Sequence, residues 1–138
     1  MAKQVFINFA VKDLERSKQF YESLGWKINP QFTDETAACI VISDTIYAMI
    51  LTEAKMQEFT SKQLADAGTT TEVLTALSFD SKDEVDEIMN KAKASGGTEA
   101  RDPQDLGFMY SRSFQDLDGH IWEPFYMDIT QAPASPAS

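Results

Sequence analysis

Apolar positions in the first half of the chain follow a strand spacing and then a helical one. Residues 5–11 are β-branched and aromatic, which is typical of a strand. Asp13 fits a helix N-cap, and the positions after it recur at helical spacing, at Leu14, Ser17, Tyr21 and Leu24. Gly25 is placed to end this helix. Three further strands are predicted at 26–28, 37–42 and 47–52.

The second half repeats this order. A strand is predicted at 73–79, and Ser81 followed by Glu84 has the spacing of a capping box. The buried stripe of the helix that follows is predicted at Val85, Ile88, Met89 and Ala92, with Tyr21 and Leu24 as its counterparts in the first helix. Gly96 and Gly97 are placed to stop the second helix, and three more strands are predicted at 98–100, 108–114 and 121–127.

Strand, helix and three strands therefore occur twice, which predicts an α+β fold. We expect one duplicated domain over residues 1–128, with module one at 3–52, a connecting segment at 53–72 and module two at 73–128. Residues 129–138 are small and polar, and we expect them to form a disordered tail.

Charge and cysteine content narrow the partners and the compartment. The 138 residues carry a net charge of −10, so the field of the protein repels nucleic acid and anionic membranes. No stretch approaches the roughly 20 apolar residues of a membrane helix, and residues 1–4 do not begin a signal peptide. Cys39 stands alone and can form no internal disulfide. We expect a cytoplasmic protein with a small-molecule ligand and with neither nucleic acid nor membrane as a partner.

The most informative segment lies near the end of the second module. Residues 116–120, Asp-Leu-Asp-Gly-His, are typical of a turn, and the strand after them carries Glu123 among aromatic residues. A carboxylate in an apolar strand is costly to bury unless it is paired or has a task. Together with residues 7–14, 17–21 and 24–26, this segment resembles the vicinal oxygen chelate superfamily of glyoxalases, bleomycin-resistance proteins and extradiol dioxygenases.

The resemblance covers about residues 3–128 and implies an architecture. Two tandem βαβββ modules would form a curled mixed sheet around a cleft, usually completed in a homodimer. Metalloenzymes of the superfamily place their ligands on the first and last strands of each module. Those positions correspond here to Asn8, Met49, Leu74 and Glu123.

Only Glu123 among these four suits a divalent metal. Such ions need about three or four N, O or S ligands, mostly histidine and carboxylate. Leucine donates nothing, methionine is a poor ligand for a hard ion, and an asparagine amide is a weak one. We therefore expect no metal site and no other cofactor.

Several side chains have both a structural and a functional interpretation. Glu123 is either a structural carboxylate, paired with Arg112 on a neighbouring strand, or a ligand contact and the sole candidate for a catalytic role. Asn8 either has a structural role, capping an irregularity of the strand ladder or hydrogen-bonding Glu123, or contacts ligand. His120 is favoured as a turn residue. Arg112, facing the cleft, would invite an anionic ligand. The full set of ligand-binding candidates is Asn8, Met49, Leu74, Tyr110, Arg112 and Glu123, with Tyr110 alternatively in the core or a dimer interface.

Three function classes remain open. The first is a metal-independent small-molecule binder, in which the acidic field and aromatic residues hold a cationic or amphipathic compound. The second is a metal-dependent lyase or dioxygenase of the superfamily, similar to lactoylglutathione lyase. The third is a non-catalytic domain that keeps only the fold. We favour the first.

Overall fold

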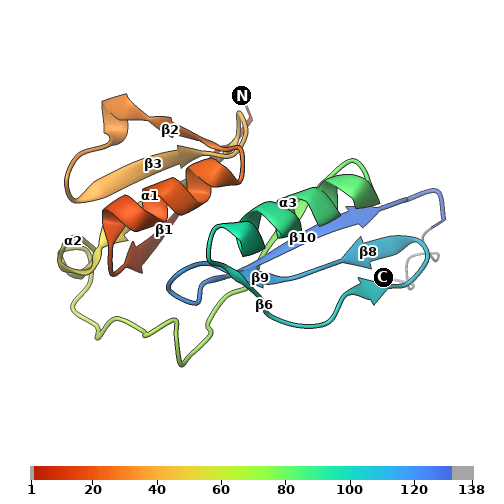
Figure 1. The fold of residues 1–138 in the computed structure, drawn as a ribbon. Helices are drawn as coiled ribbons and strands as arrows, with labels where there is room; N and C mark the ends of the chain where they lie inside the picture. Colours follow the sequence, from red (N-terminus) through yellow and green to blue (C-terminus); the bar gives the residue numbers. More distant parts are fainter. Residues whose placement is uncertain (1, 132–138) are drawn as a thin grey trace, which may run out of the picture. The chain divides into compact units, whose positions relative to one another are not determined.

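The computed structural model of the chain describes residues 2–131. Clustering of its contacts divides the chain into two units, Met1–Thr70 and Thr71–Ser138. Of the tail expected at 129–138, the last seven residues lie outside the described residues, and the first three form a turn after Asp128. The predicted α+β fold with mixed sheets is confirmed (Figure 1).

The first unit holds a four-stranded sheet in the order β1-β4-β3-β2. The first and last strands of the unit pair in parallel, and the other two pairings are antiparallel. The strands are β1 (Val5–Val11), β2 (Lys27–Asn29), β3 (Ala37–Val41) and β4 (Ile46–Thr52). The helical segments are α1 (Leu14–Ser23), η1 (Pro30–Phe32) and α2 (Glu53–Gln57).

Helix α1 has the ends that its sequence predicts. The side chain of Asp13 accepts a hydrogen bond from the Arg16 backbone N–H at 3.1 Å, as an N-cap does. Gly25 follows the helix with a φ of 98°, the left-handed conformation that glycine adopts at little cost. Tyr21 is fully buried, and the ring of Trp26 stacks on it with centroids 5.9 Å apart. The aromatic contact holds the chain against the helix where it turns towards β2.

The second unit is built around its last strand, β10 (Ile121–Met127), with β5 parallel on one side and β8 and β9 antiparallel on the other. Again the first and last strands of the unit pair in parallel, so the repeat seen in the sequence is a repeat of strand pairing. The remaining elements are β5 (Thr75–Ser78), α3 (Lys82–Ala94), β6 (Thr98–Glu99), β7 (Gln104–Asp105), β8 (Met109–Ser111) and β9 (Phe114–Gln115).

The strand predicted at 108–114 is interrupted, and the reason is a proline on its neighbour. The register of β8 and β9 against β10 is continuous and places Arg112 opposite Pro124. The Arg112 N–H donates to the Pro124 carbonyl at 3.0 Å, but proline has no N–H to return the bond. Strand β7, which the sequence did not predict, adds a short pairing outside β8.

Helix α3 covers one face of this sheet and packs along β10 (Figure 1). The predicted buried stripe is confirmed, because Val85, Ile88, Met89 and Ala92 are all at most 4% exposed. Ser81 caps the helix by accepting from the Glu84 N–H at 3.1 Å. The returning bond is shifted by one residue from the predicted capping box, since the Glu84 carboxylate accepts from the N–H of Asp80.

None of the helices within residues 2–131 has the length and apolar character needed to cross a bilayer.

The sheet of the second unit has one face packed on α3, and no helix of the same unit covers its other face. Trp122 and Pro124 of β10 are buried on the α3 side. Because side chains alternate along a strand, Glu123 points to the opposite face.

Candidate functional site

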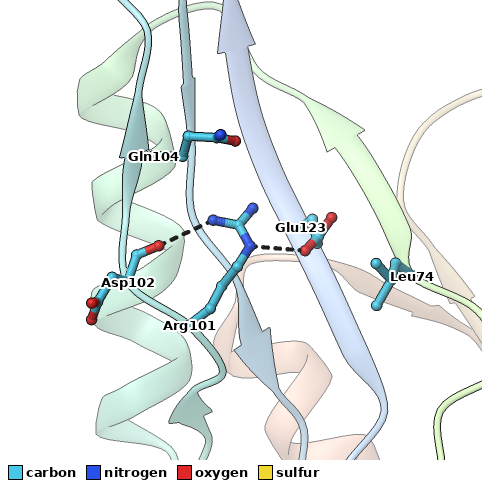
Figure 2. Close-up of a pocket in the computed structure, with 5 residues that line it drawn as sticks. All are labelled: Leu74, Arg101, Asp102, Gln104 and Glu123. Atoms are coloured by element: carbon cyan, nitrogen blue, oxygen red, sulfur yellow. Dashed lines mark hydrogen bonds and ion pairs between the residues drawn. The ribbon is translucent and has the colours of Figure 1, made fainter.

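The helix-free face of the second sheet carries a hollow around Glu123. In register with Glu123 on β5 lies Ala76, which is exposed. The hollow has a volume of about 550 Å³ and is open to solvent; its lining residues are Leu74, Arg101, Asp102, Gln104 and Glu123 (Figure 2).

Arg101 is the residue that organises this hollow. Its Nε donates to Glu123 Oε2 at 3.2 Å, its Nη2 to Ser111 Oγ at 2.7 Å, and its Nη1 to the backbone carbonyl of Asp102 at 3.1 Å. The first of these contacts is a salt bridge that spans 22 residues of sequence. Three hydrogen bonds fix the guanidinium plane, so Arg101 is held before any ligand arrives.

Glu123 is half-buried, and its carboxylate is only partly paired. Its side chain is 19% exposed, and Arg101 contacts only one of its two oxygens. Within residues 2–131, Oε1 of Glu123 has no hydrogen-bond partner. The register also places Ser113 opposite Glu123, and Ser113 Oγ is a buried atom without a partner in the same described range. The strand thus brings unmet polar groups to the position that the sequence singled out.

The predicted pairing of Glu123 with Arg112 is wrong. Glu123 pairs with Arg101 instead. Arg112 lies one position out of register with Glu123 and therefore projects from the opposite face of the sheet, towards α3. There it donates to Glu99 at 2.9 and 3.1 Å and to Asp86 on α3 at 2.9 Å. The Arg112 side chain is 13% exposed and connects the helix to the sheet.

Tyr110 belongs to the same cluster as Arg112. Its hydroxyl donates to Asp86 at 2.6 Å, and partial burial and this bond to a carboxylate both raise the pKa of Tyr110. Burial would raise the pKa of Asp86 too, but the hydrogen bonds from Tyr110 and Arg112 outweigh it and lower that pKa. The structure therefore places Tyr110 and Arg112 in a structural network on the α3 face, away from the hollow.

The two candidates of the first unit lie side by side. Asn8 on β1 and Met49 on β4 are register partners, on the face of their sheet opposite the one covered by α1. The Asn8 amide donates to the carbonyl of Phe6 on its own strand at 3.0 Å. A bond from Asn8 to Glu123 would join the two units and stays a prediction.

Leu74 and His120 flank the strands of the second unit. The strand predicted from residue 73 begins instead at Thr75, and Leu74 precedes it with 55% of its surface exposed. The backbone N–H of His120 donates to Asp116 at 2.8 Å, one of three successive N–H groups that this carboxylate accepts. Asp116 thereby builds the turn that leads into β10, as an aspartate in a turn commonly does.

The donor set around Glu123 does not fit a divalent metal. In the described part of the chain, no three or more His, Cys, Asp or Glu side chains are grouped so that they could hold an ion. The guanidinium of Arg101 lies against Glu123, and its positive charge would oppose a cation at the same carboxylate. A metal at this position would have to displace an existing ion pair and find ligands elsewhere.

Comparison with known proteins agrees with this fold. The family model described as bleomycin resistance protein-like N-terminal matches residues 3–43. A hypothetical protein from S. aureus is 32% identical, with 91% of this chain and 95% of that chain covered and a TM-score of 0.76. The fold of the chain is that of the glyoxalase/bleomycin resistance/dioxygenase superfamily.

Two further structures of the superfamily share the fold at lower identity. A glyoxalase-related enzyme from Fulvimarina pelagi is 21% identical over the whole of both chains, with a TM-score of 0.77. A glyoxalase/bleomycin resistance protein/dioxygenase family enzyme from Burkholderia phytofirmans is 17% identical over 91% of this chain and 99% of that one, with a TM-score of 0.74. None of the curated proteins compared with the chain matches it significantly.

Arg101 was not among the residues that the sequence singled out. Strand β6 ends at Glu99, and the chain bends at Arg101. If strand alternation had continued, Arg101 would have shared a face with Glu99 and Arg112. The sequence indicates only that Arg101 directly precedes Asp102 and Pro103. Strand alternation does not predict the side-chain direction of a residue at such a bend.

Proposed function

We propose that this protein binds a small organic molecule without a metal, in the hollow around Arg101 and Glu123. The observation that carries the proposal is the salt bridge between these two side chains on the helix-free face of the second sheet. It supplies fixed polar groups at the place where a metalloenzyme of the superfamily would use Glu123 as a ligand. In small-molecule sites a small number of placed polar groups fix the orientation of the ligand.

The lyase or dioxygenase alternative has less support. Asn8, Met49 and Leu74 occupy the other implied ligand positions, and their side chains offer weak donors or none. Arg101 also competes electrostatically with any cation at Glu123. The proposal is therefore recognition of a ligand rather than turnover through a metal centre.

The metal prediction tests this proposal directly. After purification without chelator, we expect zinc, nickel, iron and manganese to be substoichiometric by elemental analysis. Added metal should not raise the melting temperature through Glu123, so wild type and Glu123→Gln should respond alike. Glu22→Gln, an exposed carboxylate on α1, is the matched control. One equivalent of metal that is lost in Glu123→Gln but kept in Glu22→Gln would overturn the proposal.

The ligand prediction separates a binder from a fold-only domain. A molecule that binds the native state raises the melting temperature by mass action. We expect a chemically diverse set of small molecules to contain compounds that do so in wild type and less in Glu123→Gln. If no compound shifts the melting temperature of the wild type, the binding function is contradicted and the non-catalytic alternative stands.

A further inference from the structure

We infer that the Arg101–Glu123 pair recognises a zwitterionic head group, with a carboxylate bound by Arg101 and an ammonium bound by Glu123. This inference rests on the proposed binding function and names its ligand class as amino-acid-like molecules. It follows from the hydrogen-bonding groups that the pair leaves unused, from their charges, and from the apolar side chains beside them.

Arg101 supplies a fixed donor. A guanidinium has five N–H groups, and three hydrogen bonds occupy Arg101 through Glu123, Ser111 and the Asp102 carbonyl. The remaining N–H groups have no partner among residues 2–131, on a side chain that is 36% exposed to the hollow. Because the guanidinium is already held, a ligand carboxylate that binds it need not order the side chain.

Glu123 supplies the matching acceptor. Oε2 is bonded to Arg101, whereas Oε1 accepts no hydrogen bond from the described residues. Figure 2 shows Glu123 between Arg101 on one side and Leu74 on the other. A donor that reaches Oε1 completes the hydrogen bonding of a carboxylate on a side chain that is 19% exposed, which an unliganded site leaves to water.

The two charges of the Arg101–Glu123 pair select against simple ions. A monovalent anion at Arg101 would meet the carboxylate of Glu123 and the net charge of −10. A monovalent cation at Glu123 would meet the guanidinium of Arg101. A zwitterion places each of its charges beside the opposite one, and as a neutral molecule it is not repelled by the protein's overall field.

The flank of the hollow favours an aliphatic body on the ligand. Leu74 is 55% exposed and lines the hollow. Ala76, the register partner of Glu123, is exposed on the same face. These side chains offer apolar contact next to Oε1, where the ammonium and its attached carbon would lie. L-leucine combines the head group and the aliphatic body and is the probe of choice.

The test compares L-leucine with two analogues, each lacking one charged group, by NMR titration of ¹⁵N-labelled wild-type protein. The analogues are 3-methylbutylamine, which lacks the carboxylate, and 4-methylpentanoate, which lacks the ammonium. We expect L-leucine to shift the Arg101 Nε–Hε signal and the backbone signals of β10. It should bind roughly tenfold or more tightly than either analogue, because each analogue loses one charge-assisted hydrogen bond. Equal affinity of the three compounds, or tighter binding of either analogue than of L-leucine, would overturn the inference.

Two variants then assign the head-group contacts. Arg101→Met should reduce L-leucine binding to the level of the amine, and Glu123→Gln should reduce it to the level of the acid. Arg16→Met and Glu22→Gln, exposed positions on α1, should bind as wild type does. Binding of L-leucine that survives Arg101→Met unchanged would contradict the role of Arg101, and the comparison of probes on wild type stands even if a variant is unstable.

Failure of this inference is distinguishable from failure of the proposed function. If other small molecules raise the melting temperature through Glu123 while L-leucine does not bind, the protein is a binder of a different ligand class. If nothing in the diverse set binds, both proposals fall together.

Discussion

At the scale of single residues, strand alternation separates two arginines into different roles. Arg112 is directed towards α3, where Asp86 and Glu99 hold it on a largely enclosed face of the sheet. Arg101 reaches the other face because the chain bends where β6 has ended, and it pairs with Glu123. Arg112 therefore connects the helix to the sheet, whereas Arg101 lines the hollow.

The Asp86 cluster predicts a pH dependence of stability. Hydrogen bonds from Tyr110 and Arg112, working against partial burial, hold the pKa of Asp86 below its ordinary value of 3.8. A lowered folded-state pKa stabilises the native state above the unfolded value, and this stabilisation is lost as the pH falls through the folded pKa. We expect Asp86→Asn to cost stability near neutral pH and to converge with wild type only as the pH falls below the lowered folded-state pKa of Asp86.

Urea unfolding across an acidic pH series checks this. Glu72→Gln, which changes an exposed carboxylate outside the helices, is the control and should have the same stability as wild type. A difference between wild type and Asp86→Asn that stays constant down to acid pH would show that the charge of Asp86 contributes nothing.

At the scale of elements, each boundary has a local chemical cause. Asp13 and Ser81 start the two long helices by accepting hydrogen bonds from free N–H groups. Gly96, with a φ of 102°, ends α3 and leaves the Gly97 N–H bonded to the carbonyl of Ala92 at 2.8 Å. The break between β8 and β9 also has a chemical cause in a single residue, because Pro124, opposite the break, has no backbone N–H to donate.

The packing of α3 gives the element-scale prediction. Ile88 is 4% exposed within the buried stripe of the helix. Truncation to alanine removes apolar contact and leaves a cavity, so Ile88→Ala should lower the free energy of unfolding by about 2–5 kcal/mol. Asn90→Ala, at an exposed position of the same helix, should change it by no more than about 0.5 kcal/mol. Equal effects of the two substitutions in chemical denaturation would remove Ile88 from the core.

At the scale of the whole molecule, the two units repeat one plan. Each begins with a strand, continues into a helix that covers one face of the sheet, and ends with the strand that pairs in parallel with the first. Each first strand lies at the edge of its own sheet. On β1, Val5 and Phe6 are 47% and 48% exposed.

Exposed edges and apolar side chains predict a homodimer. Sheet edges are normally paired or covered, because their free backbone groups otherwise invite aggregation. A two-fold symmetric pair is the commonest soluble assembly. We expect light scattering at tens of micromolar to give twice the mass of the chain. A monomer mass at that concentration would rule this arrangement out.

The sequence by itself determined the features that depend on neighbouring residues. The helix caps, the spacing of Ile88 and Met89 and the turn before β10 were all predicted and are present. The predicted order of elements is present too, except that β7 is added and the strand predicted at 108–114 is divided into β8 and β9. The likeness in fold to the superfamily could also be inferred from short motifs, because turn glycines and strand patterns keep their spacing wherever the fold is kept. The importance of Glu123 followed from the cost of placing a carboxylate in an apolar strand.

Only the tertiary structure decided which charges meet. Glu123 lies 22 residues from Arg101 and 11 from Arg112, and the chain could have delivered either arginine to it. Register placed Arg112 opposite Pro124 and so on the far face, while a bend after β6 turned Arg101 towards the hollow. A shift of one residue in a strand reverses the face of every side chain. Side-chain pairing across a sheet is therefore fixed by register and bends, which local sequence patterns do not encode.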